Sequence, residues 1–280
     1  MQKDSLQPFI FKNRAVRGCL VRLNESYQTI HLQHHYSALL SKLLGETLLG
    51  VILIASHFKQ RGQATLQFQG QGALKLLSAR MTADYGIRGL IRAEPNLITV
   101  KNLMDALQDG QLSLSYEGLN AGQNYQSIVP VEGISIAQAL EHYFVRSEQL
   151  PTRFFLASTD KLAVGLLLQI MPAKEGEAAL DDFQHITILA ETLKDSELLT
   201  LSFTEILTRL YHEEDLELFP ETSVHFSCNC SPDRMKQILR SLGKNEAEAI
   251  LAEHAFIEIT CEFCNQIHRF DPAEVAEIFL

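Results

Sequence analysis

Cysteine is scarce over most of this sequence. Cys19 is the only cysteine before residue 228, and the other four of the five lie between residues 228 and 264. Five cysteines in 280 residues are too few for the disulfide framework of a small secreted domain. The pattern favours metal binding or redox chemistry for the four tail cysteines. Cys19 lies in a strand pattern far from them, and we expect a buried structural thiol there.

The chain is also short of positive charge, with 24 lysine and arginine residues against 34 aspartate and glutamate residues. Its formal net charge is −10 and its pI is near 5.5. A field of this sign repels phosphate backbones and anionic lipid headgroups. We therefore expect neither nucleic acid nor a membrane among its partners.

Uninterrupted apolar runs are short. The most apolar stretch, residues 43–58, is broken by Glu46, Thr47 and His57 and falls short of the roughly 18 to 20 residues that span a bilayer. We expect a buried core helix over residues 36–58. The opening stretch, MQKDSLQPFIFKNRAVRG, carries polar and charged residues where an export signal would be apolar, so we expect a cytoplasmic protein.

Residues 1–175 alternate strand-like and helix-like patterns. A helix over residues 135–150 is predicted by Ser135 and Gln138, which have capping-box spacing, and by Pro151, which would end it. The predicted strands are residues 17–23, 64–70, 73–81, 88–94, 111–118, 125–133, 152–158 and 162–172. This balance predicts one α+β domain built on a mostly antiparallel sheet.

Residues 176–223 differ from residues 1–175 in their residue pattern, which predicts two helices and a charged connector. Acidic residues crowd together at Glu213, Glu214, Asp215, Glu217 and Glu221. We expect a helical charged linker that packs on its neighbours. Residues 224–280 then form a small C-terminal domain, which is too short to be stable through hydrophobic burial alone.

The four tail cysteines form two close pairs. Cys228 and Cys230 are a CxC pair, and Cys261 and Cys264 are a CxxC pair. Together they supply four thiolates, the full tetrahedral shell of a structural zinc site. His225 and His268 flank the pairs and could in principle be ligands, but with four cysteine ligands present a fifth ligand is unnecessary.

The residues around the pairs fit such a site. Ser231 and Pro232 predict the start of a helix that Gly243 ends, and the helix N-terminus would favour the thiolate form of Cys228 and Cys230. The expected apolar face of that helix is Met235, Ile238, Leu239 and Leu242. The stretch FIEITCEFCNQIHRF predicts a hairpin whose turn holds Cys261 and Cys264.

Two interpretations of the pairs remain open from spacing alone. The site could be a closed structural zinc centre that only holds the tail together. Alternatively, residues two or three positions apart can approach closely enough for a disulfide, so each pair could close on itself if an oxidant removed the metal. Metal binding in such a unit also supplies its folding energy, so loss of the ion would unfold it.

The cysteine pairs, within FSCNCSPDRM and ITCEFCNQIHRFD, resemble those of the redox-regulated heat-shock protein thirty-three family of bacterial chaperones. SEQLPT and the cysteine pairs are the most specific parts of a resemblance that covers nearly the whole chain. Its other stretches are LLGETLL (43–49), LQFQGQGAL (66–74), YFVRSEQLPT (143–152), GLLLQIMP (165–172) and LYHEEDLELF (210–219).

This resemblance implies a holdase, which is a chaperone that binds unfolding proteins without ATP, and not an enzyme. In the reduced, inactive state Cys228, Cys230, Cys261 and Cys264 would hold one Zn²⁺. Oxidants such as peroxide or hypochlorous acid would form the disulfides Cys228–Cys230 and Cys261–Cys264 and release zinc. The tail would unfold, the linker would lose its support, and the active protein would bind clients and dimerise.

The sequence departs from the family pattern at two positions. His268 stands where the family commonly has tyrosine, and Val164 stands where a glycine is usual. Neither is a ligand position, so the departures bear on the tuning of the switch and leave the ligand set unchanged.

Two other classes of protein share part of this cysteine pattern. A zinc-ribbon nucleic-acid-binding protein would share the ligands but needs a basic face, whereas the tail holds seven glutamates between residues 246 and 277. A thiol-disulfide oxidoreductase would use one CxxC on a βαβ scaffold and has no use for a second pair. The GQG stretch lacks the strand-to-helix context of a phosphate loop, and HEEDL is not the HExxH of a metalloprotease.

Overall fold

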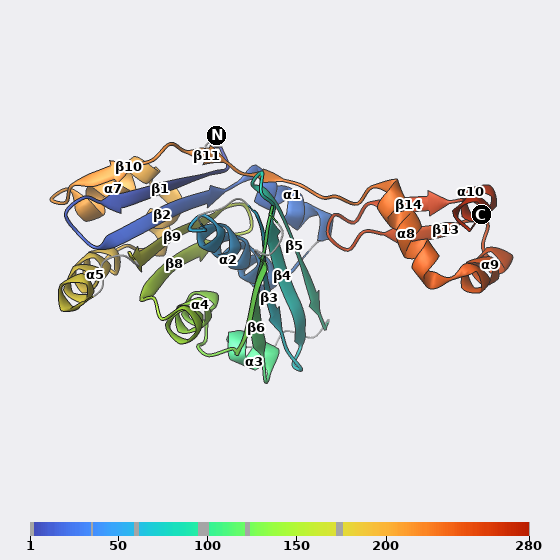
Figure 1. The fold of residues 1–280 in the computed structure, drawn as a ribbon, viewed down its shortest axis with the longest axis horizontal. Helices are drawn as coiled ribbons and strands as arrows, with labels where there is room; N and C mark the ends of the chain where they lie inside the picture. Colours follow the sequence, from blue (N-terminus) through green and yellow to red (C-terminus); the bar gives the residue numbers. More distant parts are fainter. Residues whose placement is uncertain are drawn as a thin grey trace. The chain divides into compact units, whose positions relative to one another are not determined.

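A computed structural model describes residues 3–34, 36–58, 62–94, 101–120, 124–171 and 176–279. The chain folds into two compact units, Met1–Phe226 and Ser227–Leu280, and combines helices with antiparallel sheets (Figure 1). The α+β prediction is therefore confirmed. The boundary expected at residues 175 and 176 falls at the edge of a stretch, 172–175, that lies outside the described residues.

The larger unit contains a six-stranded antiparallel sheet in the order β10-β1-β2-β9-β8, with β11 added beside β1. Its strands are β1 (Ser5–Phe11), β2 (Val16–Leu23), β8 (Thr152–Ser158), β9 (Ala163–Ile170), β10 (Leu216–Leu218) and β11 (Thr222–Ser223). Every side chain of β9 is buried, because the sheet is covered on both faces.

A second six-stranded sheet has the order β12-β5-β4-β3-β6-β7. Its strands are β3 (Gly62–Gln69), β4 (Leu74–Met81), β5 (Gly86–Ala93), β6 (Gln111–Gly118), β7 (Asn124–Pro130) and β12 (His225–Phe226). Only β12 runs parallel to its neighbour, β5. The eight predicted strands are present, but the single expected sheet is two sheets, since alternation predicts strands without specifying their partners.

Helix α2 (Ala38–Ala55) is the central element of the larger unit, and Figure 1 shows it between the two sheets. Ser37 caps its N-terminus by accepting a hydrogen bond from the Leu40 amide. The helix meets the length and composition of a membrane span, contrary to our expectation that it would fall short, yet 72% of it is buried inside the protein. Its burial confirms the predicted core helix.

The remaining helices of the first 171 residues are short. They are α1 (Glu25–His34), α3 (Leu103–Leu107), α4 (Ile136–Tyr143) and the π-helix η2 (Phe144–Glu148). Ser135 caps α4 as predicted, but the Gln138 side chain accepts from the Ile134 amide, so the reciprocal half of the capping box is missing. The single helix expected over residues 135–150 is thus an α-helix followed by a π-helical turn.

Helices α5 (Glu177–Ala190), α6 (Asp195–Thr200) and α7 (Phe203–Tyr211) pack on one face of the first sheet, where Figure 1 shows α5 and α7. They build a hydrophobic core of their own with that sheet, in which Ile186, Leu207 and Tyr211 pack among side chains such as Phe11 and Leu166. The acidic stretch after α7 is not a continuation of the helix. It contains β10, which pairs with β1 and so binds the end of this segment to the sheet.

The smaller unit consists of α8 (Pro232–Leu242), α9 (Lys244–Glu253), β13 (Ile257–Thr260), β14 (Ile267–Phe270) and α10 (Pro272–Ile278). The predicted helix and hairpin are both present. Met235 and Leu239 of α8 enter the core, whereas Ile238 and Leu242 are 48% and 46% exposed, so the expected apolar face is only half correct. Seven buried residues form this core, which is small for an independent unit.

Candidate metal centre

The four tail cysteines meet at one end of the smaller unit. Their Sγ atoms all lie within 4.8 Å of one another, and every one is a free thiol. The shortest approaches are between pairs, with Cys228 and Cys261 at 3.6 Å and Cys230 and Cys264 at 3.1 Å. The structure therefore brings together the four cysteines that the sequence singled out.

Cys228 and Cys230 reach this site because α8 begins directly after them. The Ser231 side chain accepts a hydrogen bond from the Arg234 amide, and Pro232 occupies the first turn, where its missing N–H costs nothing. The Ser231 amide in turn donates to the Asn229 carbonyl at 3.0 Å. This local network sets the backbone that carries the CxC pair.

Cys261 and Cys264 lie in the turn between β13 and β14. The Cys261 amide donates to the Gln266 carbonyl at 2.9 Å, and the Asn265 amide donates back to the Cys261 carbonyl at 2.8 Å. Asn265 has a φ of 55°, a left-handed conformation that asparagine tolerates better than most residues. The turn thereby brings both thiols to the same side of the hairpin end.

Gln266 is a member of the site that the sequence did not indicate. Its side-chain oxygen lies 3.7 Å from Cys230 Sγ, in addition to the backbone bond to Cys261. Its position two residues after the CxxC pair, in the turn directly before β14, is the signal that could have pointed to it.

Burial and mutual proximity oppose ionisation of most of these thiols. Burial raises the pKa of Cys230 to about 11, and burial and the neighbouring thiols raise the pKa of Cys264. Burial also disfavours the Cys261 thiolate, but hydrogen bonds from the Cys264 and Phe263 amides outweigh it and lower that pKa. At Cys230 burial thus outweighs the helix N-terminus that we expected to favour the thiolate.

A bound cation would change this balance. A tetrahedral shell with metal–sulfur bonds of about 2.3 Å places neighbouring sulfur atoms roughly 3.8 Å apart. The Sγ atoms need only small shifts from their present separations to reach that geometry. Four soft sulfur donors around one point fit a tetrahedral divalent metal ion, whose charge would stabilise the thiolates.

The other candidate residues lie elsewhere. His225 belongs to β12 in the larger unit, where its Nε2 is 3.7 Å from the Asp84 carboxylate. His268 is buried on β14 opposite Ile259. Among the described residues, the cluster of potential ligands contains neither histidine. Cys19 is fully buried, as predicted, and burial raises its pKa to about 12.

A family model described as Hsp33 protein matches residues 4–271 of this chain. The chain belongs to the Hsp33 family. Its relatives include the 33 kDa chaperonin of Methylobacillus flagellatus, which is 41% identical over 99% of this chain and 94% of the relative. The 33 kDa chaperonin of Shewanella loihica is 37% identical over 100% of this chain and 96% of its own length.

The Hsp33 fold is also seen in a solved structure. The crystal structure of a 33 kDa chaperonin from Thermotoga maritima superposes with a TM-score of 0.83, covers 98% of this chain and 97% of that one, and shares 23% identity. The relatives of this Hsp33 chain are named as chaperonins and not as enzymes, which agrees with the expectation of a non-enzyme.

Proposed function

We propose that this protein is a redox-regulated holdase that binds unfolding proteins under oxidative stress. The observation that carries the proposal is the group of four free cysteines within 4.8 Å, in a small unit of a chain that belongs to the Hsp33 family. In the reduced state Cys228, Cys230, Cys261 and Cys264 hold one Zn²⁺, the usual ion for a site of four thiolates. The bound ion supplies folding energy to the unit.

Oxidation changes the bonds that the cysteines make. One thiolate of a pair attacks hydrogen peroxide and becomes a sulfenic acid, with release of water after protonation. The second thiolate attacks that sulfur, so the S–S bond forms and the oxygen leaves as a second water. Each disulfide costs the protein two electrons, which one peroxide molecule accepts, and two pairs therefore consume two peroxide molecules.

The pairing has a physical consequence for the fold. Disulfides Cys228–Cys230 and Cys261–Cys264 link neighbours in the sequence, so they leave the start of α8 and the hairpin free to separate. Cross-links between the closest sulfur atoms would instead join residues more than 30 positions apart and would staple the unit. We propose the neighbouring pairs, because only they couple loss of the ion to loss of the fold.

Unfolding of the small unit would then reach residues 176–223. This charged linker leads directly, through β10, β11 and β12, into the first cysteine pair. It is the segment that we expect to loosen after the domain of residues 224–280 unfolds, and the core of residues 1–175 would remain folded. Client binding and dimerisation would follow from apolar side chains that this change exposes.

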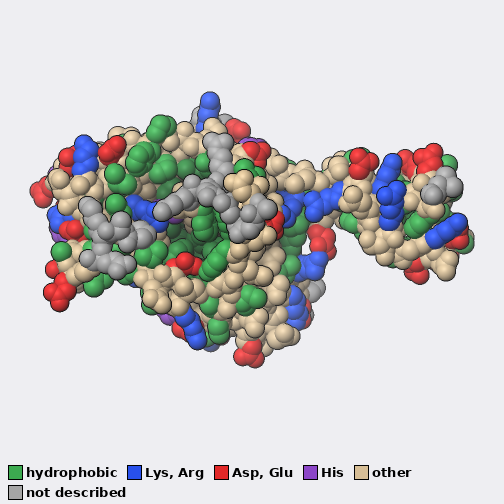
Figure 2. Space-filling view, viewed as in Figure 1, with side chains coloured by type: hydrophobic (Ala, Val, Ile, Leu, Met, Phe, Trp, Pro, Cys, Tyr) green, Lys and Arg blue, Asp and Glu red, His purple; other side chains and the backbone are tan. Residues whose placement is uncertain are grey.

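The surface supports a protein partner over nucleic acid. On the face that Figure 2 shows, acidic and basic side chains are interspersed, without a broad basic field. The net charge of −10 points the same way. We propose a cytoplasmic protein without a nucleic-acid or membrane partner, since a reducing compartment keeps the four thiols available for the metal.

The test treats the full reduced chain with hydrogen peroxide and then with a reductant. Zinc release is followed with a chelating dye, and suppression of aggregation is measured on a thermally unfolding client at the same time points. We expect both to rise together and to reverse together when reductant and zinc are returned. Equal activity of the zinc-bound and oxidised forms would leave only a structural zinc site.

Disulfide mapping by mass spectrometry tests the proposed disulfide pairing independently of the chaperone activity. Peptides linked through Cys228–Cys230 and Cys261–Cys264 are expected. Predominant Cys230–Cys264 links would contradict the proposed pairing, whatever the activity. Turnover of a small dithiol substrate would instead favour an oxidoreductase, and a salt-dependent shift of RNA or DNA in a gel would favour a zinc ribbon.

A further inference from the structure

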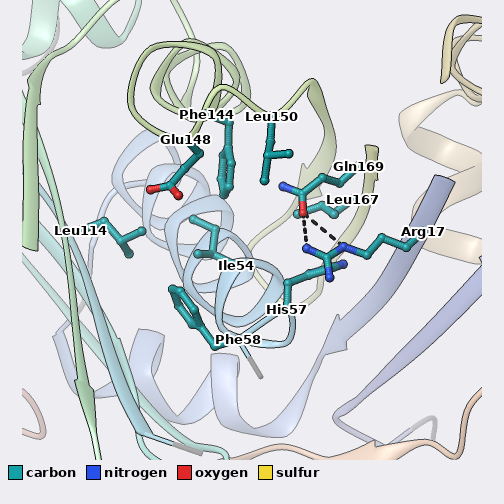
Figure 3. Close-up of a pocket in the computed structure, with 10 residues that line it drawn as sticks. All are labelled: Arg17, Ile54, His57, Phe58, Leu114, Phe144, Glu148, Leu150, Leu167 and Gln169. Carbon is teal, nitrogen blue, oxygen red and sulfur yellow. Dashed lines mark hydrogen bonds between the residues drawn. The ribbon is translucent and has the colours of Figure 1, made fainter. Parts of the chain in front are cut away.

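The larger unit contains a cavity of about 160 Å³ that the redox function does not use. It lies between the end of α2, the start of β2, the turn after the π-helix and strand β9 (Figure 3). Its walls are mostly apolar. The lining residues are Arg17, Ile54, His57, Phe58, Leu114, Phe144, Glu148, Leu150, Leu167 and Gln169.

One side of the cavity carries a guanidinium group. Arg17 Nε and Nη2 both donate to the side-chain oxygen of Gln169, at 3.2 and 2.5 Å. Nε and Nη2 thus donate along one edge of the guanidinium. The N–H groups along the edge formed by Nη1 and Nη2, called the end fork below, can still donate to another acceptor. Within the part of the chain that the structure describes, no carboxylate lies within ion-pair distance of Arg17. Burial lowers its pKa, as expected for a cation removed from water without a counter-ion.

A second group beside Arg17 has a defined hydrogen-bonding role. His57 Nδ1 lies 2.9 Å from the Leu53 carbonyl oxygen, which can only accept, so this nitrogen carries the proton. Burial and the neighbouring Arg17 lower the pKa of His57 to about 4, which keeps the ring neutral near pH 7. Among the described residues that line the cavity, Arg17 is therefore the one cation.

The opposite side of the cavity carries a negative charge. Glu148 accepts hydrogen bonds from the hydroxyl groups of Tyr125 at 2.6 Å and Tyr143 at 3.1 Å. Figure 3 shows its carboxylate well separated from the Arg17 guanidinium, with Phe144, Ile54 and Leu150 between them. An anionic group in the cavity would therefore be attracted to the Arg17 side and repelled from the Glu148 side.

The backbone at this wall is irregular. Phe144 and Glu148 are the two ends of the π-helix η2, a rare conformation that is frequently found at functional sites. Gln149 follows with a φ of 54°, and Leu150 then turns to the cavity. The stretches YFVRSEQLPT and GLLLQIMP, which carry part of the family resemblance, supply half of the lining residues. Neither stretch contributes a residue to the metal centre.

We propose that this cavity binds a small monocarboxylate with a compact apolar body, such as an aromatic or branched aliphatic acid, with its carboxylate on the end fork of Arg17. An arginine fork matches the two oxygens of a carboxylate. A cavity of about 150 Å³ lined by apolar side chains holds one benzene ring, so the volume here suits one ring or one branched chain. The apolar body then lies against Ile54, Phe144 and Leu150.

The proposal does not depend on the redox function, because every lining residue belongs to Met1–Phe226 and no cysteine takes part. The test uses the full reduced chain and three probes of nearly the same shape, namely benzoate, benzamide and benzamidine, in calorimetric titrations. Benzoate is expected to bind at least tenfold more tightly than neutral benzamide, and benzamidine, whose cation Arg17 repels, is expected to bind more weakly than benzoate.

Variants then locate the site. Arg17→Gln is expected to weaken benzoate binding about tenfold or more, and Arg17→Lys, which keeps the charge without the fork, by less. Leu150→Phe, at a half-buried position, should fill the cavity and abolish binding of all probes. Arg146→Gln is the matched control, because Arg146 lies on the same π-helix but is exposed and paired with Glu132. Circular dichroism confirms that each variant is folded.

Several results would overturn the proposal. They are absence of benzoate binding at millimolar concentration, equal binding of benzoate and benzamide, and equal loss in Arg17→Gln and Arg146→Gln. The last experiment uses a short peptide with a free apolar C-terminal residue as a competitor of benzoate. If it displaces benzoate and binds more tightly, while its amidated form does not, the occupant is a chain terminus and not a small acid.

Discussion

The Arg14 guanidinium holds the Glu214 carboxylate in a two-point ion pair, with Nε to Oε2 and Nη2 to Oε1 both at 2.9 Å. Arg14 lies in the turn between β1 and β2, and Glu214 lies between α7 and β10. Arg14 Nη1 also reaches Asp182 of α5 at 3.0 Å. One side chain of the first hairpin therefore ties together both ends of the helical segment that covers the sheet.

We expect Arg14→Gln to loosen this helical segment. The change removes the guanidinium from two partly buried carboxylates, so that Asp182 keeps the Ala15 amide and Glu214 keeps His185. Charge-assisted hydrogen bonds of the lost kind are worth about 1 to 3 kcal/mol. Hydrogen exchange should become faster in α5 and α7, and client binding should begin at a lower oxidant dose. The control is Lys12→Gln, because the Lys12–Asp215 pair is exposed. Equal effects of the two changes would contradict the prediction.

A second prediction concerns the buried carboxyl group of α2. Burial raises the pKa of Glu46 to about 7, although Lys42 opposes the shift. An acid with a raised folded pKa destabilises the fold once the pH exceeds its unfolded value, and the full penalty is present above the folded value. Glu46→Gln should therefore raise the free energy of unfolding by on the order of 1 to 3 kcal/mol at pH 8 and by much less at pH 5.

Urea denaturation at the two pH values measures this difference. Glu213→Gln is the control, since the Glu213 side chain is 88% exposed. A Glu46→Gln effect that is the same at pH 5 and pH 8 would show that packing, and not ionisation, decides the role of this residue.

The cysteines should differ sharply in their effect on metal content. Cys264→Ser replaces a thiolate donor with a hydroxyl group, which is a poor ligand for a soft ion, and should reduce bound zinc from about one ion per chain to near zero. Cys19→Ala should leave zinc unchanged, because Cys19 lies in the core of the larger unit. Atomic absorption on the purified proteins measures both. Full zinc content in Cys264→Ser would remove Cys264 from the ligand set.

The cap of α8 offers a milder change to the same site. Ser231→Ala removes the acceptor for the Arg234 amide and should destabilise the smaller unit by about 1 kcal/mol. Zinc transfer to a chelator should become faster as a result. Ser241→Ala is matched within the same helix, where Ser241 only donates to the Gln237 carbonyl on the exposed face. Similar transfer rates for both variants would show that the cap does not limit metal release.

The clustering of the four tail cysteines could be expected from the sequence because the signals for it are local. Cys228 and Cys230 precede a capped helix, Cys261 and Cys264 occupy a hairpin turn, and each signal lies within a few residues of the ligand. The cavity around Arg17 left no such signal. Its polar members, Arg17, Glu148 and Gln169, come from distant parts of the chain and meet only after both sheets have formed.

Strand formation was likewise predictable from local patterns, whereas strand pairing depends on tertiary contacts. The eight strands predicted from alternation are present, but their assignment to two sheets depends on the packing of both around α2. The sequence predicts a charged connector within a helical linker for the acidic stretch after α7, and charge patterning is uninformative about strand pairing. Its strand β10 is only three residues long and forms through β1, so a tertiary partner overrides the local pattern.

Among the buried residues that the structure describes, the core of the smaller unit shares no side chain with those of the larger one. Because the smaller unit has a core of its own, two cooperative transitions are the natural expectation on heating. A single melting temperature would then not describe this molecule. Chelators and the cap variant should move one transition, changes at Arg14 and Glu46 should move the other, and calorimetry would count the transitions directly.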